Sequence, residues 1–384
     1  MSARPTHHSR ACNLFIIPGM KILFDYQTFH TQRFGGISRY FYEIGCRMKG
    51  VQPTFAIPFT MNQYIRHSKM ANHVNIPKRL FKILEGVFRQ INRRWAAHKI
   101  KQGHFDLFHP TYYNPYFLNL LGKKKFVLTI HDMTHERYPQ YFSPNDPTPA
   151  YKRQLAERAT RIIAISECTK RDIMLYLHVP EEKIDVIYHG LSPKPLAEGK
   201  PEGLPDEYIL YVGERRGYKN FELLLEVFVQ VHERYPNMHL VLTGRPISKH
   251  EHELFVQKGL QESILVMNDI SDLVLAQLYR HARLFVYPSL YEGFGIPILE
   301  AFAQKCPVVA SRASCFPEVA GDAAAYFSPQ SAQELAEAIL HTLSDAAYRN
   351  QLVERGCERL KLFTWEETAR KTEETYRKAL KADQ

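Results

Sequence analysis

The stretch SLYEGFGIPILEAFAQKCPVVAS, residues 289–311, sets two carboxylates, Glu292 and Glu300, on either side of a glycine-rich turn. Seven residues separate the two acids, and they include Gly-Phe-Gly and a proline. The apolar run LFVYPS (residues 284–289) that leads into the turn is typical of a buried strand, and a helical pattern starts near Ile298. The stretch therefore predicts a strand–turn–helix unit, with one acid in the turn and the other early in the helix.

A turn of this kind suits a phosphate-bearing ligand. Gly293 and Gly295 let the backbone turn tightly, and bare N–H groups at the start of a helix favour an anion. Carboxylates accept hydrogen bonds from hydroxyls, so two separated acids fit a sugar nucleotide, with one acid on the sugar and the other on the ribose. At an arbitrary site such acids would more often be a helix cap and a solvated surface acid, but the glycines and the strand–turn–helix context favour ligand binding.

The composition sets the protein class. The chain has 384 residues, 45% of them apolar and 23% charged, which fits two globular domains. No apolar run approaches the roughly 20 residues that span a bilayer. The six cysteines are scattered without a C-x-x-C pair, which predicts a reduced cytosolic protein without a disulfide framework or zinc site. The net charge of +10 implies an anionic partner: a nucleotide, a membrane surface or a nucleic acid.

Short β-branched runs alternate with longer amphipathic stretches, which is typical of βαβ units and parallel sheets. Ten strands are predicted, at residues 21–26, 105–110, 126–132, 161–166, 184–190, 208–213, 239–244, 263–269, 284–289 and 306–311. Helical patterns lie between them, for example at residues 35–48 and 221–235. The predicted fold class is α/β, with two doubly wound, Rossmann-like domains facing a central cleft.

A Pro- and Gly-rich segment, residues 191–206, is predicted to be the interdomain linker. It separates an N-terminal domain at 20–190 from a C-terminal domain at 207–364. Residues 1–19 have no long apolar core or cleavage site and are expected to be a disordered leader. Ligands of such sheets bind beyond the carboxyl ends of the strands, so chemistry is sought just after them.

Several segments together resemble one enzyme family. YEGFGIPILEA (residues 291–301) resembles the E-x7-E signature of family-4 retaining glycosyltransferases, which have the GT-B fold. Further matches follow in chain order from about residue 20 to the C-terminus: RFGGISRY (33–40), LTIHDM (128–133), RIIAISECTKRDI (161–173), LYVGERRGYKNFELLLEVF (210–228) and FTWEETARKTEETYRKAL (363–380). The whole-chain similarity is best to bacterial members labelled mannosyltransferases.

The resemblance implies an acceptor-side N-terminal domain, a C-terminal domain that binds the nucleotide sugar, and a helix at 365–384 that crosses back to the first domain. The residues that it implies for donor binding are Gly35, Gly36, Gly213, Arg215, Lys219, Glu292, Gly293, Phe294, Gly295, Ile296 and Glu300. The catalytic residues that it implies are His131, Arg215, Lys219 and Glu292.

The residues themselves support these roles. Arg215 and Lys219 follow a predicted strand, where charge-assisted bonds would neutralise a diphosphate as it leaves. Arg216 is adjacent, and the sequence leaves open which arginine faces the ligand. His131 ends an apolar strand; in the resembled family this histidine contacts the transferred sugar, and its backbone carbonyl stabilises positive charge at the anomeric carbon. A structural histidine is the alternative.

The expected reaction moves a hexose, first of all mannose from GDP-mannose, to a saccharide or lipid-linked saccharide acceptor with retention. UDP-glucose and other donors stay open. The sequence has no D-x-D motif of the kind that binds a metal ion at the diphosphate. Arg215 and Lys219 would neutralise the diphosphate without a metal, so no metal or cofactor is expected. The departing phosphate would take the proton of the acceptor hydroxyl.

Two segments concern the acceptor side. Residues 76–102 carry eight Lys/Arg and one Glu among apolar residues at helical spacing, which fits either an anionic membrane surface or a helix packed on the first domain. If residues 76–102 bind a membrane, the enzyme is expected to be cytoplasmic and to lie on the inner face of that membrane. Tyr112, Tyr113 and Tyr116 are candidate stacking residues for the acceptor sugar, or else loop-packing aromatics.

Other function classes fit less well. Nucleic-acid binding would explain the positive charge, but a nucleic-acid motif is missing and the two glutamates would have no role. Another GT-B enzyme, such as a UDP-glucose-type transferase, an epimerase or a phosphorylase, is the second alternative. A non-catalytic sugar-nucleotide-binding module is the third, and the intact motif set argues against it.

Overall fold

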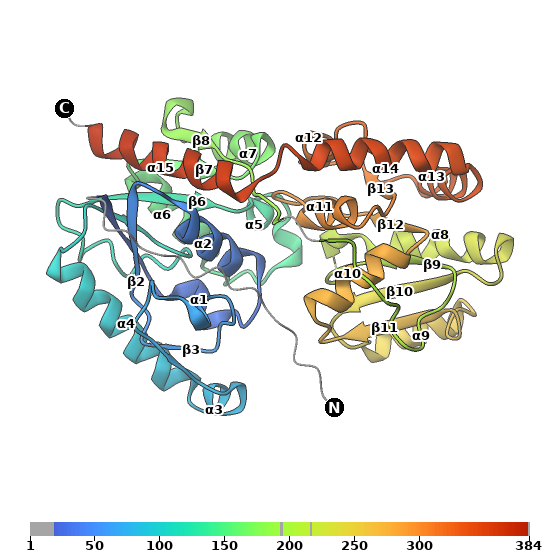
Figure 1. Ribbon diagram of the computed structural model, residues 1–384, viewed down its shortest axis with the longest axis horizontal. Coiled ribbons are helices and arrows are strands. Elements are labelled where there is room, and N and C mark those ends of the chain that lie inside the picture. The colour runs from blue at the N-terminus through green and yellow to red at the C-terminus, as the bar shows by residue number, and fades with distance from the viewer. Residues whose placement is uncertain (1–18, 193–194, 216, 383–384) are drawn as a thin grey trace. The chain divides into compact units, whose positions relative to one another are not determined.

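The computed structural model describes residues 19–192, 195–215 and 217–382 (Figure 1). The expected leader therefore lies outside the described residues except for Gly19, and so do residues 193–194 of the predicted linker and Arg216.

The elements alternate along the chain as the βαβ pattern predicts. Up to residue 190 the strands are β1 (Met20–Phe24), β2 (Val51–Phe55), β3 (Phe59–Thr60), β4 (Val74–Asn75), β5 (Leu107–His109), β6 (Lys125–Ile130), β7 (Arg161–Ala164) and β8 (Ile184–Val186). The helices there are α1 (Gln27–Thr31), α2 (Gly36–Arg47), α3 (Lys78–Ile83), α4 (Glu85–Gln102), α5 (Thr134–Arg137), α6 (Thr148–Arg158) and α7 (Glu167–Leu177), with 3-10 turns at Ile65–His67, Pro139–Tyr141 and Glu181–Lys183.

The second half continues the alternation. Its strands are β9 (Tyr208–Tyr211), β10 (His239–Gly244), β11 (Ile264–Asn268), β12 (Leu284–Tyr287), β13 (Val308–Ser311) and β14 (Ala324–Phe327). Its helices are α8 (Phe221–Arg234), α9 (Lys249–Gln257), α10 (Asp272–His281), α11 (Ile296–Ala303), α12 (Phe316–Ala320), α13 (Ala332–Ser344), α14 (Ala346–Leu360) and α15 (Trp365–Lys381), with a 3-10 turn at Gly217–Lys219.

Two six-stranded sheets organise the described chain. Their strand orders are β2-β1-β5-β6-β7-β8 and β11-β10-β9-β12-β13-β14, and neighbouring strands such as β1 and β5 or β9 and β12 run parallel. All ten predicted strands are present, and the prediction of an α/β, parallel-sheet fold class is confirmed. The second sheet has the order 3-2-1-4-5-6 of dinucleotide-binding domains, in which the direction of winding reverses between its first and fourth strands.

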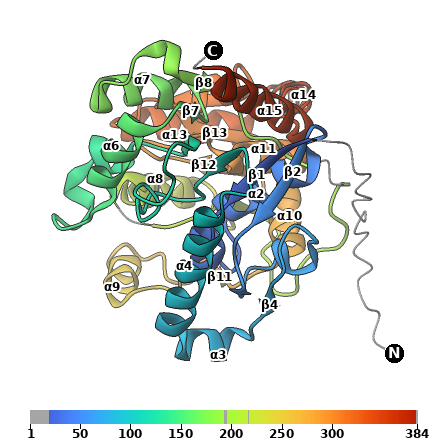
Figure 2. The ribbon, with the colours of Figure 1, turned by 90° about the vertical axis from the view of Figure 1, so that its left-hand side faces the viewer.

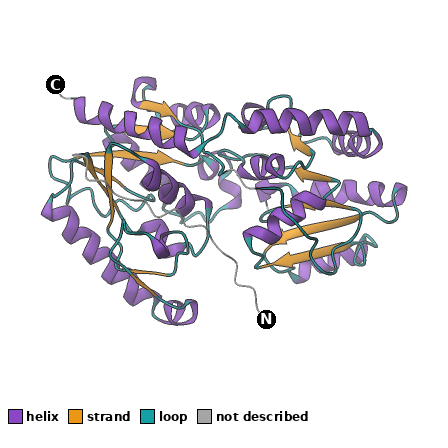
Figure 3. Ribbon diagram, in the orientation of Figure 1, coloured by secondary structure: helices purple, strands orange, loops and turns teal. Residues whose placement is uncertain are grey.

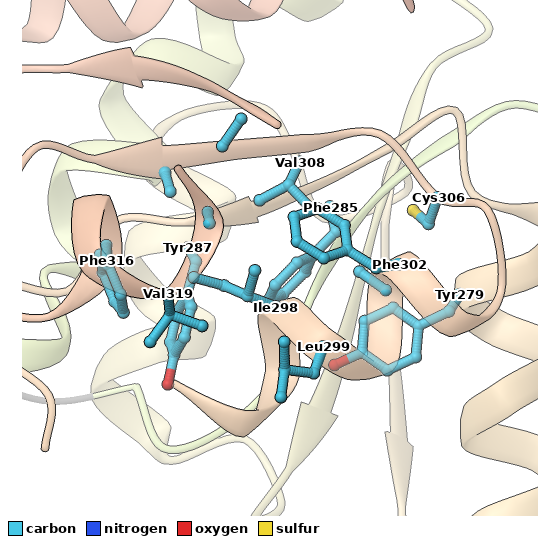
Figure 4. Packing of buried hydrophobic residues seen from close by; sticks show 14 of the residues in the cluster. Tyr279, Phe285, Tyr287, Ile298, Leu299, Phe302, Cys306, Val308, Phe316 and Val319 are labelled. Carbon is cyan, nitrogen blue, oxygen red and sulfur yellow. The ribbon is translucent and has the colours of Figure 1, made fainter. Parts of the chain in front are cut away.

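Helices cover both faces of the second sheet (Figure 3), because successive strand residues point to opposite sides. Tyr208 and Phe285 join one buried cluster with α11, whereas Ile209 and Leu284 join another with α8. Figure 4 shows the first cluster, in which Ile298, Leu299 and Phe302 of α11 pack among Tyr279, Phe285 and Tyr287.

Helix α11 begins at Ile296, two residues before the predicted start near Ile298, and Pro297 lies in its first turn. Proline is tolerated there because the first helical N–H groups have no partner within the helix. Gly295 precedes the helix with a φ of 89°, a left-handed conformation that glycine adopts without strain.

The described residues form two compact units. Unit 1 comprises residues within 1–128, 159–161 and 369–384, and unit 2 those within 129–158 and 162–368. The later part of α15 belongs to unit 1, where the Tyr376 hydroxyl lies 2.7 Å from Nδ1 of His109. The domain boundaries inferred from the sequence remain predictions. In the described ranges, every helix is either too short or too polar to cross a membrane.

Candidate active site

The candidate site lies in unit 2, where the winding direction of the second sheet reverses. β9 and β12 are neighbours there and run parallel, so the loops that follow them leave the same edge of the sheet. The loop after β9 carries Lys219 and the loop after β12 carries Glu292. Ligands of doubly wound sheets bind at this edge.

The structure brings these two side chains together. Nζ of Lys219 lies 2.6 Å from Oε1 of Glu292, and both side chains are largely buried, at 17% and 14% exposure. The hydroxyl of Ser289 also donates to Oε1 of Glu292, at 2.8 Å. Burial lowers the pKa of Lys219, but the charge and hydrogen bond of Glu292 act together with Tyr218 and Asp132 to outweigh burial. The net shift of this pKa is upward, so the ammonium stays charged. An anion and a hydroxyl-rich ligand would both find partners here.

The backbone of His131 lies so close to Gly293 that position 293 requires glycine. A Cβ atom on residue 293 would lie 1.8 Å from the carbonyl oxygen of His131, so only glycine fits. The carbonyl of Gly293 in turn accepts from Oγ1 of Thr169 at 3.3 Å. The turn predicted from the sequence is therefore held against the end of β6, next to the His131 carbonyl.

The His131 side chain is neutral at physiological pH. It is buried, and burial lowers its pKa to about 4 although the charge of Asp132 opposes the shift. Its ring lies 6.0 Å from the nearly parallel ring of His189, whose pKa burial also lowers. His189 packs edge-on against Phe294, 5.2 Å between ring centroids. Phe294 is therefore a buried packing residue in this structure.

Arg215 is placed differently from the sequence expectation of a ligand-facing cation. Its side chain is fully buried, and Nε donates to Oε1 of Glu251 at 2.9 Å. Its terminal nitrogens donate to the carbonyls of Thr243, Arg245 and Pro246. These contacts join the loop after β9 to the loop after β10. The direct phosphate contact inferred from the sequence remains a prediction, and Arg216 lies outside the described residues.

Glu300 lies apart from the Lys219–Glu292 pair, beside a small cavity of about 30 Å³. The hydroxyl of Tyr279 is 3.5 Å from Oε2 of Glu300. The residues that line the cavity are Leu191, Asp272, Leu275, Ala276, Tyr279, Glu300, Ala303 and Gln304. The structure thus gives the two glutamates separate surroundings, as separate ribose and sugar contacts would require.

The remaining donor glycines differ in their surroundings. Gly213, after β9, has a φ of 126° and open space where a side chain would stand. In unit 1, Gly35 and Gly36 stand at the start of α2. One of the first N–H donors of this helix, that of Ser38, already donates to Oε1 of Gln32 at 3.0 Å. A Cβ atom on Gly35 would clash with that same amide. Ile296 is half-buried at the first position of α11.

The three candidate acceptor tyrosines do not form one exposed platform. Tyr112 is exposed, whereas Tyr113 is 3% exposed and belongs to the core. The Tyr116 hydroxyl donates to Oδ2 of Asp25 at 3.2 Å. Tyr112 is therefore the most exposed of the three, Tyr116 is partly exposed, and the acceptor-stacking role stays a prediction.

Two buried charged residues escaped the sequence reasoning. Asp25 follows β1 and accepts from Thr111, Gln27 and Tyr116, which ties together the loops after β1 and β5. Its position at the carboxyl end of a predicted strand was the available signal. Lys152 is 1% exposed and donates to the Asp132 carbonyl at 2.9 Å and to Oε2 of Glu136 at 3.0 Å, which fixes the segment after His131. It lies inside a helix, and no motif in the sequence marks it.

Known proteins match this chain over most of its length. Residues 34–194 match the family described as "Glycosyltransferase Family 4", and residues 197–359 match "Glycosyl transferases group 1". The O-antigen chain mannosyltransferase B of Escherichia coli is 30% identical over 331 residues, which cover 81% of this chain and 84% of that protein.

Solved structures share the fold. Sucrose-phosphate synthase from Thermosynechococcus elongatus superposes with a TM-score of 0.74 at 23% identity, over 95% of this chain and all of that one. The structure of Anabaena Alr3699/HepE in complex with UDP and glucose gives 0.71 at 19% identity, over 93% and 99% of the two chains. At these identities the structural similarity shows the fold alone. The family matches and the E. coli relative show the family and the enzyme class. The chain belongs to glycosyltransferase family 4, has the GT-B fold and is a glycosyltransferase.

Proposed function

We propose that this enzyme transfers mannose from GDP-mannose to a growing saccharide or a lipid-linked saccharide during synthesis of a cell-surface polysaccharide or lipopolysaccharide. The choice of sugar is supported by the E. coli relative, which is named an O-antigen chain mannosyltransferase. A nucleotide-sugar donor is supported by the HepE structure, whose title reports UDP and glucose. A lipid-linked acceptor would bring the reaction to the inner face of a membrane.

The observation that carries the proposal is the Lys219–Glu292 pair at the sheet's reversal point, next to the backbone contact between Gly293 and His131. Lys219 would bind the diphosphate, since a charge-assisted bond strengthens as the leaving group gains negative charge. Glu292 would accept hydrogen bonds from the hydroxyls of the transferred sugar. Glu300, at its own cavity, would accept from the ribose hydroxyls.

The proposed reaction proceeds on one face of the sugar. The bond between the anomeric carbon and the phosphate oxygen breaks first, leaving an oxocarbenium-like cation that the His131 carbonyl stabilises. The acceptor hydroxyl attacks from the side of the departing phosphate and gives its proton to that phosphate oxygen. Retention of configuration follows. Since Lys219 supplies the positive charge, the mechanism requires no metal or cofactor.

Thermal-shift measurements with GDP, UDP, ADP and dTDP, followed by transfer assays with the matching sugars, test the proposal. GDP should raise the melting temperature most, because a ligand that binds only the folded state stabilises it. GDP-mannose should then be consumed with release of GDP, and NMR of the product should show the α-anomer. Stabilisation by UDP alone would instead support the second candidate, a UDP-glucose-type transferase. The HepE structure, whose title names UDP and glucose, favours this candidate.

A further inference from the structure

Helices α3 and α4 follow each other along the outside of unit 1 (Figures 1 and 2). They carry two apolar stripes, and one of them is buried. The packed stripe consists of Phe81, Phe88, Asn92, Ala96 and Ile100, all of them buried. The rings of Phe81 and Phe88 stack 5.4 Å apart, and Phe88 lies 5.1 Å from Phe59. Asn92 bonds the backbone N–H and carbonyl of Phe59, at 3.0 and 2.9 Å. This stripe attaches the helices to the rest of unit 1.

The second stripe faces solvent. Its members are Leu80, Ile83, Leu84, Val87, Ile91 and Trp95, with exposed fractions from 37% to 70%. From Leu84 onward the spacing of three, four and four residues puts the side chains on one side of a helix. Single exposed apolar residues are ordinary, but a continuous row is typical of an interaction surface. Here six such side chains fall within sixteen consecutive positions.

Basic residues surround this second stripe. Residues 76–102 contain eight Lys/Arg and one Glu, and Lys82, Arg89 and Arg94 are exposed beside this stripe. The ammonium of Lys99 lies 5.0 Å from the Trp95 ring centre, a cation–π arrangement. A second copy of the chain would bring like charges together, which disfavours self-association through this face.

We propose that the second stripe docks onto a bilayer of anionic phospholipids. The apolar side chains would enter the boundary between headgroups and acyl chains, Trp95 would lie at headgroup level, and the flanking bases would contact lipid phosphates. The proposed function supplies the reason for such docking, a lipid-linked acceptor, but the surface itself is independent of the donor and of the chemistry.

Fluorescence gives a direct readout, because the chain has two tryptophans and Trp365 is buried at 2% exposure. Full-length protein is mixed with vesicles of phosphatidylcholine alone or with phosphatidylglycerol. Trp95 emission should shift to shorter wavelength with the anionic vesicles only, and the protein should co-sediment with them. Trp95→Phe should abolish the shift while co-sedimentation persists.

Two variants separate the apolar and the charged contributions. Ile83→Ser/Val87→Ser/Ile91→Ser should bind anionic vesicles at least about tenfold more weakly, since it removes buried apolar groups. Lys82→Gln/Arg89→Gln/Arg94→Gln should bind on the order of a hundredfold more weakly. The matched control, Leu175→Ser/Val256→Ser/Leu362→Ser, removes equally exposed apolar residues elsewhere and should bind like wild type.

Three results would overturn the inference. Wild type could stay in the supernatant with anionic vesicles at low salt, the stripe variant could co-sediment as well as the control, or light scattering could show a dimer that the stripe variant dissolves. GDP release from GDP-mannose without acceptor, measured on the same variants, should stay at the wild-type rate. Normal vesicle binding together with no donor turnover by wild type would contradict the proposed function and leave this inference intact.

Discussion

Lys219 and Glu292, 73 positions apart in the sequence, form an ion pair of 2.6 Å at the point where the second sheet reverses its winding. Both side chains are mostly removed from water, so each charge depends on the other or on a ligand for compensation. A site that holds one cation and one carboxylate at a sheet edge can bind the phosphate and the hydroxyl groups of the same sugar nucleotide.

Removing the ammonium of Lys219 should strongly slow turnover. Lys219→Ala is expected to lower kcat by roughly a hundredfold to a thousandfold, because the charge that develops on the leaving phosphate loses its preorganised partner. Glu292→Gln keeps the shape but weakens the grip on sugar hydroxyls and should raise KM for the donor as well. Steady-state donor consumption measures both, and near wild-type rates for Lys219→Ala would refute the assignment.

Gly293→Ala should damage both folding and activity. The added methyl group would meet a backbone carbonyl at 1.8 Å, and a backbone atom cannot rotate away as a side chain can. We expect a lower melting temperature and no measurable transfer. Gly86→Ala in α4, where the new methyl group meets open space, is the control and should stabilise the protein by about 0.5–1 kcal/mol. Equal melting temperatures for the two variants would contradict this reading.

The Arg215–Glu251 pair predicts a stability defect. Glu251→Gln should cost about 3–5 kcal/mol, because it leaves the buried Arg215 guanidinium without its carboxylate. Arg215→Met should cost less, because Arg245 still lies 2.9 Å from Oε1 of Glu251. The double variant should lose less than the sum, since its buried charges are removed together. Urea unfolding measures all three. If Arg215→Met instead melts like wild type but binds GDP far more weakly, Arg215 is a phosphate ligand as the sequence indicated.

Acid should destabilise the protein through His131. Its pKa falls from 6.5 in the unfolded chain to about 4 in the folded one, so the unfolded state binds the proton first. Stability should therefore decrease as pH falls from 6.5 to 4, by about 3 kcal/mol in total from this group. His131→Gln should show a shallower decrease over this window in melting curves recorded between pH 4 and 8. An identical pH dependence in both proteins would speak against a buried neutral histidine.

Most of the architecture was predictable from local patterns, and the missed elements share a physical reason. The ten predicted strands are largely apolar and lie mostly inside the sheets. The two strands missed in these sheets, β2 and β14, are edge strands. β2 contains Pro53, which only an edge strand tolerates, and β14 is a short Ala-Ala-Tyr-Phe run without alternation.

The site was less predictable than the fold. The spacing of Glu292, Gly293 and Gly295 indicated a ligand-binding turn, but sequence spacing could not reveal that Lys219 reaches Glu292 or that Arg215 turns inward to Glu251. Both depend on which loops meet in space. Likewise, the helical spacing of apolar residues in 76–102 indicated an amphipathic segment, yet only the structure separates its packed stripe from its exposed one.

Nucleotide release offers the most direct test of the claim that Lys219 and Glu292 form one nucleotide-sugar site. Purified wild type and Lys219→Ala are incubated with GDP-mannose and, separately, UDP-glucose, and free nucleoside diphosphate is quantified. We predict release from one donor by wild type, GDP-mannose first, and a loss of at least about a hundredfold in a variant that still folds. Release at the buffer rate by wild type, or at equal rates by both proteins, would contradict the account.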